Sequence, residues 1–295
     1  MNYAQPKNLA EALGLLATTP TLGDPAGCDA TVTDPWTILS GGTDFYPGSL
    51  ERPMASQVMD IHALDELKTI AQDHSQVRIG AGVTWSDVIG ADLPASFDAL
   101  KLAAREVGSV QIQNKGTLVG NLCNASPAAD GVPPLLILDA LVELTSLNGI
   151  RQLPLQEFIL GNRRIARKPN EMVTAIVIPA NRTKGNSVFM KLGARKYLII
   201  SISMVAVRVA CDNNNLISDV AVSVGSCSLV AQRLSVLEAA LYKKPLSSDL
   251  SNLVTADHLT TLAPIDDVRS TGHYRMEASL ELVRRSLISL ASGLV

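Results

Sequence analysis

The feature that most constrains this chain is the segment Thr117–Asp130, which gathers small polar residues between two apolar stretches. Glycine and short polar side chains occupy the positions that set its character: Thr117, Gly120, Asn121, Asn124, Ser126 and Asp130. Buried polar groups need hydrogen-bond partners. Two interpretations provide them, a capped loop before a helix at 133–140 or a bound ligand rich in phosphate, ribose and carbonyl groups.

A second, shorter segment has a related composition. The strand-like residues 36–39 end on Ser40-Gly41-Gly42-Thr43-Asp44. Glycine lets the backbone approach a ligand closely and adopt a positive φ, and successive N–H groups in such a turn can bind a phosphate oxygen. The plainer interpretation is an ordinary turn from a strand into a helix. A nucleotide-binding P-loop is excluded, because no Gly-Lys-Ser/Thr sequence follows.

The order of helix and strand patterns predicts three consecutive units in an α+β protein. The chain of 295 residues is long for one hydrophobic core, and 47% apolar with 18% charged residues is typical of a globular chain. We interpret residues 1–62 as a small α/β module, 63–180 as an α+β unit, and 181–295 as strands followed by helices.

Periodicity and turn residues predict the individual elements. Strands are expected at 36–39, 57–61, 77–80, 142–145, 172–179, 199–210 and 220–224. Helices are expected over 9–16, from 84 onward, and at 98–107, 231–241, 252–262 and 276–290. Residues 108–121 have little helical periodicity and are expected to form turns.

Composition excludes several classes of function. A net charge of −3 and only 4% aromatic residues argue against a nucleic-acid partner. The longest apolar stretch, 198–210, is too short to span a bilayer, and the first residues lack a signal-peptide pattern, so we expect a soluble, cytoplasmic protein. The cysteines lack the spacing of zinc or iron–sulfur sites and are expected to be reduced: Cys28, Cys123, Cys211 and Cys227.

The two polar segments resemble the flavin-binding signatures of a known family. Ser40–Asp44, and Thr117–Asn121 followed by Asn124–Asp130, look like the signatures of the FAD-binding (medium) subunits of molybdenum hydroxylases of the xanthine dehydrogenase and carbon monoxide dehydrogenase type. The similarity covers essentially the whole chain, including 173–179 and 189–197. It implies FAD as cofactor and a vanillyl-alcohol-oxidase (PCMH) type fold. Two FAD-binding sub-domains, 1–62 and 63–180, would precede a C-terminal domain at 181–295.

The resemblance also assigns residues to the cofactor. The loop at the FAD pyrophosphate would comprise Leu39, Ser40, Gly41, Gly42, Thr43, Asp44 and Phe45. A second phosphate-binding turn would use Thr117, Gly120 and Asn121. Further cofactor contacts would come from Val107, Asn124, Ser126, Asp130, Val173 and Lys191. Two positions depart from the family pattern: Val107 stands where some relatives have a Phe over the flavin, and Val119 replaces a small residue.

Lys191 would lie near the isoalloxazine, where a cation favours the anionic reduced flavin. The competing interpretation is a solvated surface lysine. No residue of this chain is expected to act as a catalytic acid, base or nucleophile, because the flavin carries the chemistry. The scattered histidines receive no role: His62, His74, His258 and His273.

The function implied by the resemblance is electron transfer within a complex. A large subunit with a molybdenum cofactor would oxidise the substrate, and a small [2Fe-2S] subunit would pass electrons to FAD in this chain. The acceptor would be NAD+, oxygen or a quinone, and the assembly a dimer of heterotrimers. Two alternatives stay open: a self-contained FAD-dependent oxidoreductase, and a scaffold subunit that has lost FAD.

One further feature is a concentration of five cations within 18 residues. These are Arg151, Arg163, Arg164, Arg167 and Lys168. They are either a solvated loop or a docking surface for an acidic partner or a dinucleotide acceptor.

Overall fold

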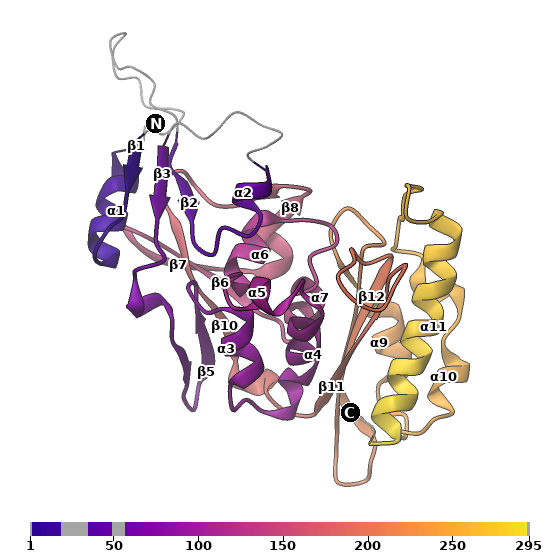
Figure 1. The fold of residues 1–295 in the computed structure, drawn as a ribbon. Coiled ribbons are helices and arrows are strands. Elements are labelled where there is room, and N and C mark those ends of the chain that lie inside the picture. The colour runs from indigo at the N-terminus through magenta and orange to yellow at the C-terminus, as the bar shows by residue number, and fades with distance from the viewer. Residues whose placement is uncertain (1, 19–34, 49–56, 294–295) are drawn as a thin grey trace, which may run out of the picture.

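The computed structural model describes residues 2–18, 35–48 and 57–293. Cys28 and most of the segment 18–35 lie outside these residues. The described residues form three larger sheets and one two-stranded sheet, with helices around them, and the larger sheets follow one another along one direction (Figure 1). The small N-terminal sheet lies at one end, a five-stranded sheet with its helices lies in the middle, and the C-terminal sheet is covered by α11 at the other end.

The N-terminal sheet, within the described residues, has three parallel strands in the order β1-β3-β2. Their bounds are β1 Asn2–Ala4, β2 Thr37–Leu39 and β3 Gln57–Asp60. The helix α1, Leu9–Ala17, begins at Asn8, whose side chain accepts from the N–H of Glu11. Its buried face, Leu13 and Leu16, belongs to the same hydrophobic cluster as residues of the middle sheet. The N-terminal and middle parts therefore share one core.

The middle sheet is antiparallel, with the order β4-β5-β10-β6-β7. Its strands are β4 Ile70–Gln72, β5 Gln76–Gly80, β6 Leu141–Ser146, β7 Gly149–Pro154 and β10 Met172–Pro179. The helices around it are α3 Trp85–Gly90, α4 Asp98–Glu106, α5 Val110–Gln113, α6 Leu118–Asn124, α7 Val132–Ile137 and α8 Leu155–Phe158. A small ribbon pairs β8 Ile159–Gly161 with β9 Arg164–Ile165, and the short α2, Phe45–Gly48, follows β2.

The C-terminal sheet is antiparallel in the order β11-β12-β13-β14. The strands are β11 Asn186–Leu192, β12 Ser203–Cys211, β13 Ile217–Gly225 and β14 Gln232–Arg233. The helices are α9 Ser235–Leu241, α10 Leu250–Leu253 and α11 Gly272–Ala291. The helix expected at 276–290 is confirmed as part of α11, in which Val283, Leu287 and Leu290 are buried and Met276 and Leu280 pack against the same cluster.

Charged side chains join the C-terminal part to the middle part. Asp139, just after α7, pairs with Arg182 and Arg233 at 2.7 Å each. Arg208 is fully buried on β12 and pairs with Asp219 at 2.8 Å. Arg182 contacts both carboxylates, so the ion pairs form one network. Because buried cations with satisfied partners fix a particular geometry, this network holds the two parts in register.

Several predicted elements are wrong in detail. Residues 108–121 are not all turn, because α5 lies within them and α6 begins there; helices this short show no periodicity. The strand expected at 199–210 begins only at Ser203, after a loop in which Leu198 has a φ of +53°. The helix expected at 231–241 begins at Ser235, because Gln232 and Arg233 pair with β13. The helix expected at 252–262 is replaced by α10 and a separate 3-10 turn, Ala256–Leu259.

The three cysteines in the described ranges are free thiols, as expected. In the same ranges, no helix combines the length and the hydropathy that a membrane crossing requires.

Candidate cofactor site

The first polar loop follows β2 and turns sharply at Gly42, whose φ is +72°. Glycine adopts this conformation readily, whereas a residue with a side chain would be strained there. Within the described residues, the N–H groups of Gly41, Gly42 and Thr43 meet no hydrogen-bond acceptor. Consecutive free N–H groups beside a left-handed residue make a concave donor set suited to an anion.

The two polar segments pack directly against each other. A Cβ on Gly41 would lie 1.9 Å from the carbonyl oxygen of Lys115, so only glycine allows this approach. A Cβ on Gly116 would lie 3.3 Å from the hydroxyl of Thr43. Farther along, the amide of Asn124 donates to the carboxylate of Asp44 at 2.9 Å. The first loop thus lies alongside α6 and the turn that precedes it.

The second segment is mainly helical and not an extended turn. The hydroxyl of Thr117 caps α6 by accepting from the N–H of Gly120 at 3.0 Å, and Asn121 accepts from the N–H of Gly131 at 3.3 Å. Ser126 accepts from the N–H of Ala128 at 3.2 Å. These hydrogen bonds are the ones expected if the segment is a capped loop and helix. They do not exclude a ligand, because a capped helix start beside free N–H groups still favours an anion.

The side chains flanking these loops do not all face outward. Val119 is 5% exposed and packs in the hydrophobic core, so it does not hold a ligand away from the loop. Leu39 and Val173 are also buried in the described structure. The ring of Phe45 meets Tyr46 edge-on, with centroids 5.4 Å apart.

A buried ion pair joins the middle part to the C-terminal part. The ammonium of Lys191 on β11 lies 2.7 Å from the carboxylate of Asp130, and their side chains are 8% and 10% exposed. The hydroxyl of Ser201 donates to the other carboxylate oxygen at 2.7 Å. Burial raises the pKa of Asp130, and the charge of Lys191 with the two hydrogen bonds offsets part of that rise. The interpretation of Lys191 as a solvated surface lysine is therefore wrong.

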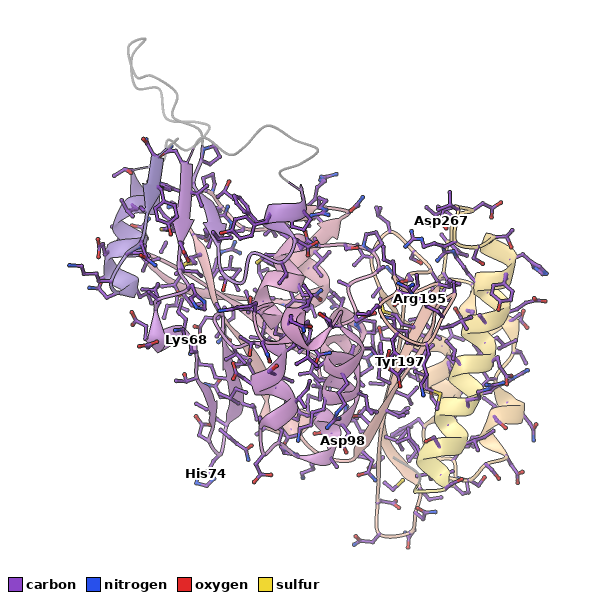
Figure 2. The ribbon with its side chains drawn as sticks, in the orientation of Figure 1. Lys68, His74, Asp98, Arg195, Tyr197 and Asp267 are labelled. Atoms are coloured by element: carbon purple, nitrogen blue, oxygen red, sulfur yellow. The ribbon has the colours of Figure 1, made fainter. Side chains whose placement is uncertain are left out.

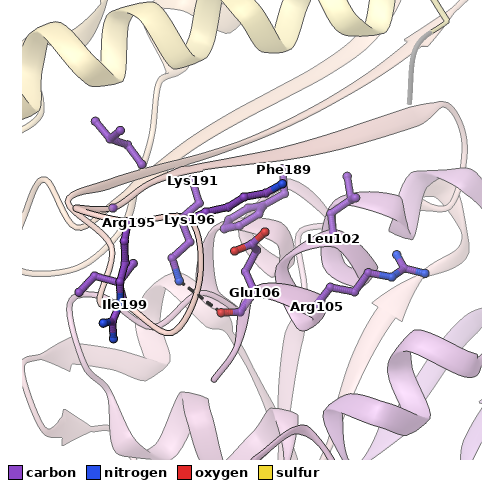
Figure 3. Close-up of a pocket in the computed structure, with 10 residues that line it drawn as sticks. Leu102, Arg105, Glu106, Phe189, Lys191, Arg195, Lys196 and Ile199 are labelled. Carbon is purple, nitrogen blue, oxygen red and sulfur yellow. Dashed lines mark hydrogen bonds between the residues drawn. The ribbon is translucent and has the colours of Figure 1, made fainter. Parts of the chain in front are cut away.

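The carbonyl oxygen of Glu106 lies 3.5 Å from the Lys191 ammonium. Val107, the next residue, ends α4 and is partly buried at the same place. A cavity of about 570 Å³ opens beside them, between α4, β11 and residues 193–199 (Figure 3). Arg195 also lines this cavity, and Figure 2 shows Arg195 and Tyr197 beside the C-terminal sheet.

The predicted cation cluster does not form one surface. Arg151 pairs with the buried Glu171 at 2.7 Å, and Arg167 donates to the backbone carbonyl of Glu171 at 2.7 Å. These two arginines fasten the chain beside β10 and are not free for docking. Arg163 instead donates to the side-chain oxygen of Asn124, which places it at the two polar loops. Sequence reasoning missed this contact, since nothing local links residues so far apart.

The predicted site residues thus form two groups on connected elements. One group offers backbone donors and small polar side chains where the first loop meets α6. The other offers Lys191, Asp130 and the adjoining cavity. Asn121 connects them, because it bonds Gly131, the residue after Asp130. Such an arrangement suits a long ligand with an anionic middle and a planar ring system at one end.

Residues 1–181 match the family described as "FAD binding domain in molybdopterin dehydrogenase". The chain belongs to this family. Residues 189–290 match a second family, "CO dehydrogenase flavoprotein C-terminal domain". This protein is therefore an FAD-binding oxidoreductase subunit of the molybdenum hydroxylase type, and FAD is its cofactor. The expected α+β FAD-binding fold with its C-terminal flavoprotein domain is confirmed.

Named relatives of this FAD-binding subunit agree with the family. The chain is 36% identical to the nicotinate dehydrogenase FAD-subunit of Eubacterium barkeri over 68% of this chain and 65% of that protein. It is 27% identical to the xanthine dehydrogenase FAD-binding subunit of Escherichia coli O157:H7, over 98% and 95% of the two chains. Its fold matches a chain of the reconstituted CO dehydrogenase from Oligotropha carboxidovorans with a TM-score of 0.87 and 23% identity, covering 99% and 98%.

The residues of this chain fit FAD. The N–H groups of the first loop, which meet no acceptor among the described residues, suit the FAD pyrophosphate. Lys191 belongs to the second group of site residues, with Asp130 and the cavity. The assignments of single side chains to parts of FAD stay predictions.

Proposed function

We propose that this subunit accepts electrons from a small [2Fe-2S] subunit and passes them through FAD to a separate acceptor. The enzyme's substrate would be oxidised on a large subunit that carries a molybdenum cofactor, and the acceptor would be NAD+, oxygen or a quinone. The names of the relatives support this arrangement, since they are FAD subunits of nicotinate and xanthine dehydrogenases. We further propose a dimer of heterotrimers as the assembly.

One observation carries the proposal. The loop after β2 and the segment that forms α6 are far apart in the sequence, but they meet at Gly41 and through the Asp44–Asn124 hydrogen bond. The chain that follows α6 leads to Asp130, which pairs with Lys191. A donor set for phosphate and a buried charge pair therefore lie on connected elements.

The residues of this chain would bind and tune the cofactor. The N–H groups of Gly41, Gly42 and Thr43 would hold the pyrophosphate, and the start of α6 at Thr117 would face the second phosphate. Lys191 would favour negative charge on the reduced ring system. Bound FAD supplies the electron chemistry, so the protein contributes position, electrostatics and exclusion of water.

Cofactor binding is tested by purifying the chain and recording its visible absorption, with FAD identified after heat release. We expect an oxidised flavin spectrum and FAD in solution after release. Gly42→Val should reduce FAD occupancy, because a side chain at a φ of +72° strains the loop and covers its donors. Full occupancy in Gly42→Val would contradict the placement of the pyrophosphate, and a wild-type chain that takes up no FAD would favour the scaffold alternative.

Electron transfer is tested by mixing the FAD-loaded chain with reduced [2Fe-2S] subunit under anaerobic conditions. Bleaching of the flavin bands, followed by recovery when an acceptor is added, is the expected result. Reduction of the isolated chain by a small organic substrate would instead support the self-contained oxidoreductase. The mass of the purified complex tests the proposed stoichiometry.

The exposed Arg164 and its neighbour Arg163 remain candidates for docking an acidic partner or dinucleotide acceptor. Reversing both to Glu should weaken assembly or electron transfer, measured by gel filtration and stopped flow. Because Arg163 also holds Asn124, Arg164→Glu alone separates docking from a local effect on the cofactor loops. Unchanged assembly and unchanged transfer in both variants would exclude the docking surface.

A further inference from the structure

Four apolar side chains stand in solvent on three segments of this subunit. They are Leu160, Leu229, Ile265 and Val268, with exposed fractions of 50, 64, 69 and 105%. Single apolar side chains at a surface are ordinary, whereas a group of them in one place marks an interaction site. We call these four residues the apolar ridge. They form one surface if the segments that carry them touch.

The three segments do touch one another. A Cβ built on Gly161, the last residue of β8, would lie 3.4 Å from the side chain of Leu229. The chain just before Leu229 runs beside the residues that lead to Ile265, because the N–H of Ala263 donates to the carbonyl oxygen of Cys227 at 3.0 Å. The apolar ridge is therefore one patch built from distant parts of the sequence.

The tip of the apolar ridge is fastened by hydrogen bonds. The buried guanidinium of Arg275 donates to the carboxylate of Asp267 at 2.7 Å and to the carbonyl oxygen of Ser226 at 3.2 Å. Asp267 and Ser270 exchange backbone hydrogen bonds at 3.0 and 3.2 Å, which closes a turn beside the start of α11 (Figure 2). This turn presents the fully exposed Val268. An apolar group that is fixed in place before binding loses little conformational entropy on docking.

Unpaired positive charge lies at the other end of the apolar ridge. The strand β8, which carries Leu160, pairs with β9, which begins at Arg164. Arg164 is exposed and forms no hydrogen bond or ion pair with a described residue. The guanidinium of its neighbour Arg163 donates to the side-chain oxygen of Asn124, an uncharged partner. The ridge therefore fits a partner that presents an apolar patch with acidic charge beside it.

We propose that the apolar ridge and Arg164 dock the small [2Fe-2S] subunit. This inference rests on the proposed electron-transfer function, and it adds the surface through which the electron donor binds. A [2Fe-2S] centre held by four thiolates carries net negative charge, and more of it when reduced. Cations on the docking face therefore attract the donor most strongly in the state that delivers electrons.

The apolar ridge is also bonded to the segments that hold the cofactor groups. The N–H of Ser226 donates to the carbonyl oxygen of Pro127 at 3.1 Å, in the segment that leads to Asp130. The guanidinium of Arg275 donates to the carbonyl oxygen of Ile202 at 2.6 Å, in the loop that follows β11. A subunit on the ridge thus rests on the segments that lead to the cofactor groups, as an electron donor must.

The first test maps the surface in the intact complex. The photo-cross-linker benzoylphenylalanine replaces Leu229 or Val268 in the tagged full chain, which is produced together with its partner subunits. The controls carry it at Val236 on α9 or at Tyr242 just after this helix, which are 55 and 50% exposed. We expect cross-links to the [2Fe-2S] subunit from both ridge positions and none from the controls. Cross-links from the ridge only to another subunit or to a second copy of this chain, or none at all, would overturn the proposal.

The second test measures the affinity of the FAD-loaded chain for the isolated [2Fe-2S] subunit by titration calorimetry. Leu229→Gln with Val268→Gln should raise the Kd about tenfold at low and at high salt, because salt does not screen apolar contacts. Arg164→Gln should raise it about threefold at low salt only, and Val236→Gln with Tyr242→Gln less than about twofold. An unchanged Kd in the ridge variant would overturn the proposal. Loss of FAD from that variant would also overturn it, because the ridge would then belong to the cofactor site.

The same proteins separate this surface from the function on which it rests. Docking that weakens in the ridge variant, without any reduction of FAD by the reduced [2Fe-2S] subunit, would support the surface and refute the electron-transfer function. FAD reduction whose rate depends on subunit concentration in the same way in wild type and ridge variant would overturn the surface and leave the function standing.

Discussion

Replacing Lys191 by Met removes the countercharge of Asp130 while keeping a long apolar side chain in its place. The ammonium and the carboxylate are 2.7 Å apart and almost fully buried. Removing one member of such a pair leaves an unpaired charge in the interior, which costs about 3 kcal/mol of unfolding free energy. The variant should therefore be clearly destabilised even though the lost group is not part of an apolar core.

The structure also sets an upper limit on this cost. Asp130 can avoid an unpaired charge by taking up a proton, and its ordinary pKa is 3.8. Keeping Asp130 protonated in the folded chain at a pH above this pKa costs about 1.4 kcal/mol per pH unit. The limit is therefore about 4 kcal/mol at pH 7 and about 1.6 kcal/mol at pH 5.

The direction of the pH dependence follows from linkage. Burial raises the pKa of Asp130, and the loss of Lys191 removes part of what offsets this rise. The folded variant thus binds the proton more tightly than the unfolded chain, so its stability is highest below the ordinary carboxyl pKa and falls as pH rises. The difference between wild type and Lys191→Met should grow from pH 5 to pH 7.

The assay is guanidinium unfolding of the cofactor-free chain at pH 5 and pH 7, followed by circular dichroism. Arg285→Met is the matched control, because its exposed pair with Glu281 has the same 2.7 Å separation and should contribute about 0.5 kcal/mol or less. Adding Asp130→Asn to Lys191→Met should abolish the pH dependence and restore stability to within about 1 kcal/mol of wild type. A loss below about 1 kcal/mol at pH 7, or one equal at both pH values, would refute this reasoning.

Two further predictions concern the first loop and acid stability. Gly41→Ala should lower the unfolding free energy by about 2 kcal/mol and weaken FAD binding, because its Cβ would lie 1.9 Å from a backbone carbonyl; Gly90→Ala, with open space around it, is the control in the same titrations. Burial opposes ionisation of Asp267, but hydrogen bonds and charges from Arg269 and Arg275 lower its pKa to about 2. Its stabilisation is present above the ordinary value and is lost as pH falls from about 4 to 2, so urea unfolding of Asp267→Asn should be less pH-dependent there; identical acid limbs would contradict this.

In this protein, the features that the sequence predicts correctly are those that depend on interactions between residues close together in the chain. The helix from Leu9 begins at a capping Asn8, and the helix at Trp85 begins at a capping box of Thr84 and Asp87, all local signals. The family signatures are also local, and they indicate FAD without reference to any tertiary contact. Short helices such as α5 are not predicted from the sequence, because four residues cannot display a helical period.

The features that sequence reasoning missed depend on residues from different parts of the chain. The sequence of its own strand does not distinguish Lys191 from a surface lysine. It is buried because Asp130, in the middle part, meets it when the C-terminal sheet packs against α4. Arg163 stands close in sequence to four other cations, yet its partner is Asn124, and two of the others bind Glu171.

Local composition thus established which residues could hold a flavin: glycines free to adopt a positive φ, small polar side chains and a cation. Packing established how they act together. Gly41 must be glycine because the Lys115 carbonyl approaches it, and the cavity exists because α4, β11 and the loop after it enclose one space. The physical reason is that conformational preference acts over a few residues, whereas burial and charge pairing depend on which distant segments fold against each other.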